Sequence, residues 1–406
     1  MQKQSRVILI LMLGALNTLT PLSIDMYLPG FQQIAAQLHT NTATVAFSVS
    51  SYFLGFSFGQ LLYGPLLDRF GRKKPLYIGL AFYIVATFCC ILVPTIQMLL
   101  VARFFQALSG CVAAVAAIAM VNDFFKPEES AGILSLMILI LGVSPLLAPT
   151  IGGFIISAFS WQYIFVMLAI LGFLLLLATI FFLPEGHQPD PTISLRFKPI
   201  TQGFKNILLQ PQFYIYALAG SISFSGLFVY VAGSPAIFME EFTVNAKIYG
   251  GIFALLSVGF IGGSQLNHLL TKKFTNQQIF KTCVIVQVIA SCIFFIGAIN
   301  QLLGMAGTLI CLFIFLACAG ITYPNAAAIA ITPFKKNAGS ASALLGCIQI
   351  GIGAFISSGV GVLPFRADVS AAVTMFTSTV IALVILLLSK VKVQHTESNN
   401  TASHIV

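Results

Sequence analysis

Long apolar segments alternate with short polar ones along nearly the whole chain, and this alternation constrains the fold more than any other feature. Each apolar run is close to the roughly twenty residues that a helix needs to cross the hydrocarbon core of a bilayer. Only 8% of the residues are charged, whereas soluble domains carry about 25%. We therefore expect an all-α membrane protein. The apolar runs predict twelve transmembrane helices near 7–28, 43–64, 75–94, 97–121, 132–157, 161–183, 211–235, 247–270, 279–299, 303–330, 338–363 and 368–390.

The basic residues predict how these helices are oriented. With twelve spans, every second connecting segment lies on the same side of the membrane. Of the 20 Lys and Arg residues, all but Arg103, Lys247 and Arg366 fall in the segments on one side of the membrane. Both ends of the chain lie on that same side. Lys and Arg are retained on the cytoplasmic side of a membrane, so both termini are expected to be cytoplasmic. This distribution also explains the net charge of +9 without nucleic acid as a partner.

One hydrophilic segment, residues 184–210, divides the predicted helices into six and six. It contains four prolines and three basic residues, which indicates a stiff cytoplasmic linker. We expect an N-terminal half at 1–183, a C-terminal half at 211–392 and a polar tail at 393–406. Transporters built from two such halves bind their substrates at the interface between them.

The most charged short segment is Tyr63–Lys74, with the sequence YGPLLDRFGRKK. Gly64 and Gly71 are expected to permit a tight turn and a close approach of helices. Asp68 is expected to pair with an arginine or with a helix N-terminus as the halves move.

Asp123 lies at the cytoplasmic end of the fourth predicted span. We expect it to pair with Arg69 or Arg72 and so latch one conformation. An ordinary surface carboxylate is the alternative interpretation of Asp123.

The same segment carries a family resemblance. Its run GPLLDRFGRKK resembles the loop between the second and third spans of the major facilitator superfamily of transporters. The resemblance implies the major facilitator fold, with two six-helix halves that rock around a central substrate cavity.

Two charged residues lie well inside predicted spans, namely Asp25 and Arg103. A charge in hydrocarbon costs at least about 2.5–3.5 kcal/mol, so such residues usually face a cavity and have a function. Desolvation disfavours an ionised carboxylate, and Asp25 is therefore our candidate for a reversible proton carrier. The alternative is a solvated Asp25 near the outer mouth.

Arg103 is a fixed cation, because an arginine does not lose its proton in proteins. It is expected to influence proton coupling at a nearby acid or to hold an anionic group of the substrate. The run RFFQALSG that begins at Arg103 resembles the superfamily's fourth-span motif R-x-x-q-G, with Ala107 in place of the glycine. A structural hydrogen-bond donor to neighbouring carbonyl groups is the alternative role.

The fifth span resembles the motif g-x-x-x-G-P-x-x-G-G of antiporters in this superfamily. Pro149, Gly152 and Gly153 match it, while Ser144 and Ala148 replace two glycines. Small residues permit close helix contact, so plain helix packing is the alternative to a role in antiport.

Within the superfamily the chain resembles the bicyclomycin/chloramphenicol-resistance (Bcr/CflA) drug exporters. The matching stretches are PLSIDMYLP at 21–29 and AGSASAL at 338–344. The resemblance implies proton-coupled efflux of small, moderately hydrophobic drugs across the bacterial inner membrane. A transporter of a physiological metabolite, a siderophore or a nutrient, is the alternative.

We expect a monomeric carrier, with the substrate, protons and the lipid bilayer as partners. The sequence has no nucleotide-binding motif and no metal-ligand spacing, so we expect no cofactor and no bound metal. The scarcity of polar catalytic groups within the spans argues against an enzyme. The residues that we expect around a substrate, each with core packing as its alternative role, are Asn17, Phe104, Phe105, Phe224, Phe228 and Tyr230.

Overall fold

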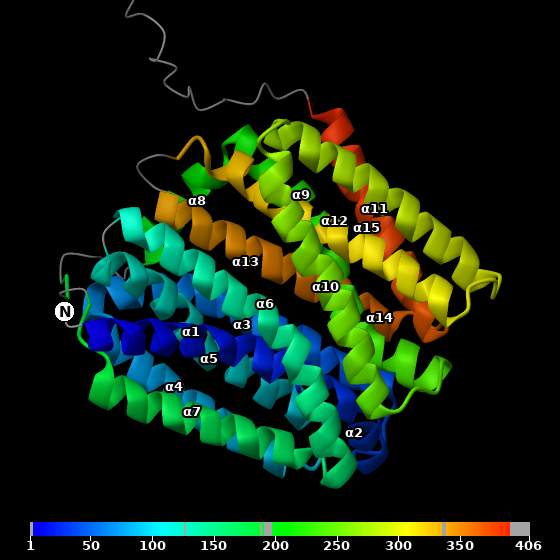
Figure 1. Ribbon diagram of the computed structural model, residues 1–406, viewed down its shortest axis with the longest axis horizontal. Helices are drawn as coiled ribbons and strands as arrows, with labels where there is room; N and C mark the ends of the chain where they lie inside the picture. The colour runs from blue at the N-terminus through cyan, green and yellow to red at the C-terminus, as the bar shows by residue number, and fades with distance from the viewer. Residues whose placement is uncertain (1–2, 126, 187–188, 191–196, 335–337, 390–406) are drawn as a thin grey trace, which may run out of the picture.

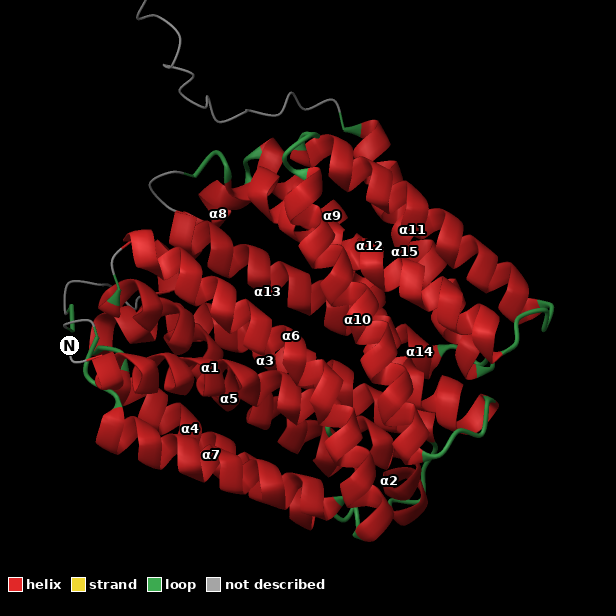
Figure 2. Ribbon diagram, in the orientation of Figure 1, coloured by secondary structure: helices red, strands yellow, loops and turns green. Residues whose placement is uncertain are grey.

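The computed structural model describes residues 3–125, 127–186, 189–190, 197–334 and 338–389. Within these ranges the chain is helical and has no strand (Figure 2). The elements are α1 (Lys3–Asp25), η1 (Leu28–Gly30), α2 (Phe31–Gln37), α3 (Thr42–Phe70), α4 (Lys73–Leu92), α5 (Ile96–Phe124), α6 (Pro127–Ala158), α7 (Gln162–Phe182), α8 (Phe197–Leu208), α9 (Pro211–Pro235), η2 (Ala236–Glu241), α10 (Ala246–Leu270), α11 (Asn276–Ile299), α12 (Met305–Ile331), α13 (Ala338–Ser357), α14 (Gly359–Val362) and α15 (Ala367–Leu388).

The described part contains 11 helices that are long and apolar enough to cross a membrane, together with a shorter apolar stretch, Val143–Ala158, inside α6. Most of the long helices begin and end within a few residues of the predicted apolar runs. The run at 338–363 is the exception, because it breaks at Ser358 into α13 and the short α14. The all-α membrane architecture expected from the sequence is confirmed.

The helices pack into two groups that meet along two extensive helix pairs. In the first group α1 packs against α5, α6 and α7, and α3 packs against α5. In the second group α9 packs against α12, α13 and α15. The groups meet where α3 contacts α13 and where α6 contacts α10. In Figure 1 the first group, coloured blue to green, lies beside the second group, coloured from yellow-green in α9 to red in α15.

Three local features differ from the sequence-based expectations. Helix α3 continues through Pro65 to Phe70, so most of the predicted loop is helical and only Gly71 and Arg72 separate α3 from α4. The predicted linker contains the amphipathic helix α8, whose Ile207 is buried. The segment after Asp25 folds into η1 and α2.

Candidate functional site

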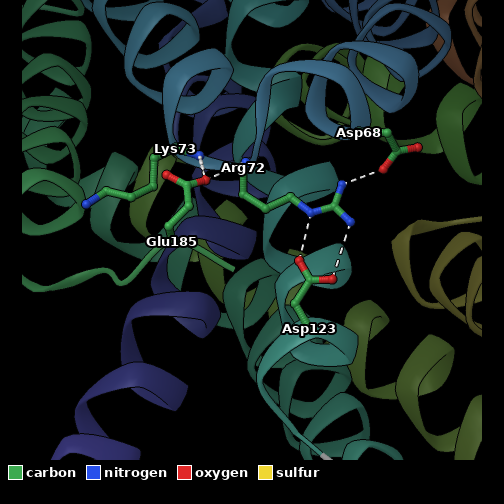
Figure 3. Close-up of polar contacts among 5 residues, drawn as sticks. All are labelled: Asp68, Arg72, Lys73, Asp123 and Glu185. Carbon is green, nitrogen blue, oxygen red and sulfur yellow. Dashed lines mark hydrogen bonds and ion pairs between the residues drawn. The ribbon is translucent and has the colours of Figure 1, made fainter. Parts of the chain in front are cut away.

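The charged segment between α3 and α4 forms an ion-pair network around Arg72 (Figure 3). The Arg72 Nε donates to Asp123 Oδ2 at 2.7 Å, and its Nη1 donates to Asp68 Oδ1 at 2.6 Å. Burial lowers the pKa of the Arg72 guanidinium, but the hydrogen bonds and charges of Asp123 and Asp68 outweigh that effect and raise the pKa overall. Arg72 is therefore a permanent cation that joins the ends of α3 and α5.

Glu185, which follows α7, completes this network, and we did not predict it. Its Oε1 accepts hydrogen bonds from the backbone nitrogens of Arg72 and Lys73, at 2.8 and 3.2 Å. A carboxylate at this position accepts hydrogen bonds from the free N–H groups at the start of α4. Its negative charge also interacts favourably with the positive end of the α4 helix dipole. Glu185 belongs to no motif and shares the predicted linker with a second acid, Asp190, so nothing in the sequence singled it out.

The two glycines of the segment behave differently. Gly71 has φ of 80°, a conformation that side chains with a Cβ rarely adopt, and it makes the turn between α3 and α4. A methyl group added at Gly64 would meet no atom within 4 Å. Gly64 therefore does not mark a close helix approach in this structure. Arg69 places its guanidinium over the Phe70 ring, and Arg72 pairs with Asp123.

Asp25 is buried at the end of α1, with 5% of its surface exposed. It makes no hydrogen bond or ion pair with the described part of the chain. The segment η1, which follows Asp25, packs against α9 and α10 of the second group, and Tyr230 and Tyr249 on these helices lie within electrostatic range of Asp25. Asp25 is therefore not solvated, contrary to the alternative considered for it, and it lies beside helices of the second group.

Side chains next to Asp25 explain this direction. Ser23 shares a hydrogen bond of 2.7 Å with the Tyr83 hydroxyl on α4, and Tyr27 shares one of 2.9 Å with Ser48 on α3. Residues two positions apart point to opposite sides of a helix. Because Ser23 and Tyr27 are held by the first helix group, Asp25 between them points away from that group.

Arg103 lies on the side of α1 where Tyr27 is held by the first helix group. No ion pair joins it to Asp25 in the described residues. It is fully buried, and its Nη1 donates to Gln106 Oε1 at 2.6 Å. The guanidinium carbon lies 4.8 Å from the Tyr27 ring centroid and 4.3 Å from that of Tyr52. Aromatic faces stabilise such a cation, so Arg103 holds Tyr27 and thereby the backbone that carries Asp25.

The glycines of α6 bring both groups close to Asp25. A Cβ on Gly152 would clash with the backbone of Met26, the residue after Asp25. A Cβ on Gly153 would lie 2.6 Å from the carbonyl oxygen of Ala246 on α10. Pro149 is buried one turn earlier on the same helix, and Gly250 of α10 packs against its carbonyl carbon.

The expected substrate-lining residues separate into two sets. On α9, Phe224 and Phe228 are buried and lie 5.6 Å apart, and the Phe228 ring is 4.5 Å from Phe53 on α3. Tyr230 is also buried on α9, within electrostatic range of Asp25. Asn17 is buried two turns before Asp25 on α1.

Phe104 and Phe105 lie elsewhere. Phe105 is 54% exposed and lines an outer apolar groove with Phe82 of α4, while Phe104 contacts Phe105 and the exposed Phe58. Their expected place in a central cavity is wrong. Helix α5 is apolar on most of its surface, so the sequence does not reveal which side of it faces outward.

Known proteins share both the sequence and this arrangement of helices. The model of the Major Facilitator Superfamily matches residues 13–358. The uncharacterized MFS-type transporter YdgK of Bacillus subtilis is 30% identical over 96% of this chain and 97% of its own length. A bicyclomycin resistance protein homolog of Haemophilus influenzae is 28% identical over 94% and 96%. The multidrug resistance protein MdtL of Escherichia coli is 32% identical over 83% and 84%.

Solved structures show the same fold at lower identity. A D-xylose-proton symporter superposes with a TM-score of 0.74 at 14% identity, covering 94% of this chain and 96% of its own. A bacterial homolog of the human lysosomal transporter Spinster, in an inward-facing conformation, superposes with a TM-score of 0.70 at 15% identity. The match covers 95% of this chain and 96% of that protein. The chain therefore belongs to the Major Facilitator Superfamily, and it is a multi-pass transporter of the bacterial inner membrane rather than an enzyme.

Proposed function

We propose that this transporter exports small, moderately hydrophobic drugs from the cell in exchange for protons, by alternating access. In this proposal twelve spans form two halves, at 1–183 and 211–392, joined by a cytoplasmic linker, with both termini in the cytoplasm. The carrier works as a monomer. One observation carries the proposal: the carboxyl group of Asp25 is buried without a partner among the described residues, at the point where α9 and α10 of the opposite half pack against the segment that follows it.

The location of Asp25 connects its proton to the movement of the halves. An unpaired charged carboxylate is costly away from water, so the arrangement around Asp25 favours a carrier that has already taken up its proton. Asp25 then loses the proton toward the cytoplasm as drug binds. The halves rock outward, a periplasmic proton neutralises Asp25 and the drug leaves. The proton-loaded carrier returns to the arrangement seen here.

The membrane potential supplies enough energy for this exchange. One proton that moves through about 100 mV releases about 2.3 kcal/mol. Since about 1.4 kcal/mol corresponds to a tenfold ratio, one proton sustains a gradient of roughly fiftyfold for a neutral substrate.

The substrate class rests on the relatives and on the aromatic side chains of α9. Two relatives are named for resistance to bicyclomycin and to multiple drugs. Phe224, Phe228 and Phe53 place adaptable apolar surface between the halves. Transport of a physiological metabolite on the same scaffold is the alternative function, and transport direction in everted vesicles compared with whole cells separates the two.

The deciding experiment measures proton release from the purified protein in detergent when candidate drugs are added. We expect the wild type to release protons and the Asp25→Asn variant to release none, while both bind drug. Glu240→Gln is the matched control, since Glu240 is an exposed acid. Drug binding by the wild type without proton release contradicts the proposed coupling.

A further inference from the structure

A small polar pocket lies where α9, α11 and α15 come together at one end of the molecule. Its volume is about 220 Å³, which corresponds to about seven water molecules of the liquid. Its polar lining comes from Tyr216 on α9, Gln277 and Lys281 on α11, and Ser389 after α15. None of these residues takes part in the site around Asp25.

The pocket is electrically positive. Lys281 makes no ion pair with a carboxylate of the described residues, and no acidic side chain lines the pocket. Gln277 and Lys281 lie in the first two turns of α11, where the helix dipole adds partial positive charge. The Thr275 cap satisfies the backbone nitrogen of Gln278, which leaves the first N–H groups of α11 for another acceptor.

The location of the pocket indicates that its ligand comes from the membrane. Its residue Gln277 comes four positions after the basic turn of Lys272 and Lys273, on the side that the basic residues assign to the cytoplasm. Leu387 lines the pocket and is 60% exposed. A molecule in the pocket therefore meets both polar donors and a lipid-facing apolar surface.

We infer that this pocket binds the phosphate group of an anionic phospholipid from the cytoplasmic leaflet. The Lys281 ammonium and the hydroxyl groups of Tyr216 and Ser389 donate to the phosphate oxygens, and an acyl chain follows Leu387. Basic pockets between transmembrane helices on the cytoplasmic side bind such headgroups. A soluble phosphate ester offers the same oxygens but leaves the apolar side of the pocket uncovered.

Native mass spectrometry of the full-length protein in detergent tests this site. The protein is titrated with dioleoyl phosphatidylglycerol, and in parallel with the phosphatidylcholine of the same chains. We expect Lys281→Gln to weaken phosphatidylglycerol binding about fivefold, the factor for one charge near an anionic surface. Tyr216→Phe, which removes only a hydroxyl group, is expected to weaken it by a smaller factor.

Lys272→Gln is the matched control, because it removes the same charge from the neighbouring turn outside the pocket. Equal losses for Lys272→Gln and Lys281→Gln would mean general attraction to a basic surface and would overturn the proposal. Unchanged binding in both Lys281→Gln and Tyr216→Phe would overturn it too. Competition by glycerol 3-phosphate at the lipid's own concentration would assign the pocket to a soluble anion instead.

Discussion

At the scale of single residues, Asp25 and Tyr230 belong to the two helix groups and lie within electrostatic range of each other, and neither forms a hydrogen bond with the described residues. The Tyr230 hydroxyl is buried and has no acceptor, whereas the neighbouring Tyr249 hydroxyl shares a hydrogen bond of 2.8 Å with Ser234. A buried donor without a partner is costly. Tyr230 is therefore a donor available to the ionised form of Asp25, while Tyr249 has a structural role.

Replacing each tyrosine with phenylalanine tests this difference. Tyr249→Phe removes the hydrogen bond with Ser234, whose hydroxyl keeps only a longer bond of 3.4 Å to the Val231 carbonyl, and we expect it to lower the free energy of unfolding by about 1 kcal/mol. Tyr230→Phe loses no hydrogen bond within the protein, so its thermal midpoint should match the wild type. Drug-evoked proton release should fall in Tyr230→Phe and persist in Tyr249→Phe. The opposite pattern in the two variants would assign the donor role to Tyr249.

Arg72 permits a second test at this scale. Hydrogen bonds to charged groups contribute about 1.5–3 kcal/mol each, and Arg72 donates to two carboxylates while being 8% exposed. Arg72→Gln should therefore lower both the thermal midpoint and the transport rate. Lys74→Gln removes the same charge from an exposed position of the same segment and should leave both values near the wild type. Equal effects of the two substitutions would mean that net charge, not the network, matters.

At the scale of elements, the contact between α6 and α10 depends on small residues. Gly153 of α6 and Gly250 of α10 each leave room for the backbone of the other helix. The apolar run at 132–157 predicted α6, and the resemblance to an antiporter motif singled out its glycines, but the sequence gave no sign that α10 is the partner. Contacts between segments about a hundred residues apart depend on tertiary packing, which helical periodicity alone does not specify.

The neighbouring glycines of α10 form a matched pair for this contact. A Cβ on Gly250 would lie 2.8 Å from the Cα of Thr150, while one on Gly251 would meet no atom within 4 Å. Overpacking of this kind costs about 1–3 kcal/mol. We expect Gly250→Ala to lower the transport rate and the thermal midpoint, and Gly251→Ala to lower neither. If Gly250→Ala transports at the wild-type rate, the close contact is not needed for the cycle.

At the scale of the whole molecule, the sequence predicted the long helices well because the bilayer fixes their length. It missed α2 and α8, since the thickness of the bilayer does not fix the length of helices as short as these. The two helix groups also meet through polar contacts that no pattern in the sequence predicted. Ser50 of α3 bonds to Ser357 of α13 at 2.9 Å, and Gln32 of α2 donates to the Met239 carbonyl at 3.0 Å.

Alternating access requires these contacts to break in every cycle, and one native cysteine makes this testable. The Ser57 hydroxyl of α3 lies 3.3 Å from the Cys347 sulfur of α13. Ser57→Cys therefore places two thiols across the interface. Under a membrane-permeant oxidant such as copper phenanthroline we expect a disulfide that fixes α3 to α13 and reduces transport to about a tenth or less, because the halves no longer rock.

Dithiothreitol should restore transport in this variant. The double variant Ser57→Cys with Cys347→Ala should be insensitive to the oxidant, which separates the new link from oxidation of the other cysteines. A cross-linked protein, shown by mass spectrometry of the bridged peptides, that still transports at the full rate would mean that α3 and α13 move as one unit. The alternation would then take place at the contact between α6 and α10, where the glycines next to Asp25 lie.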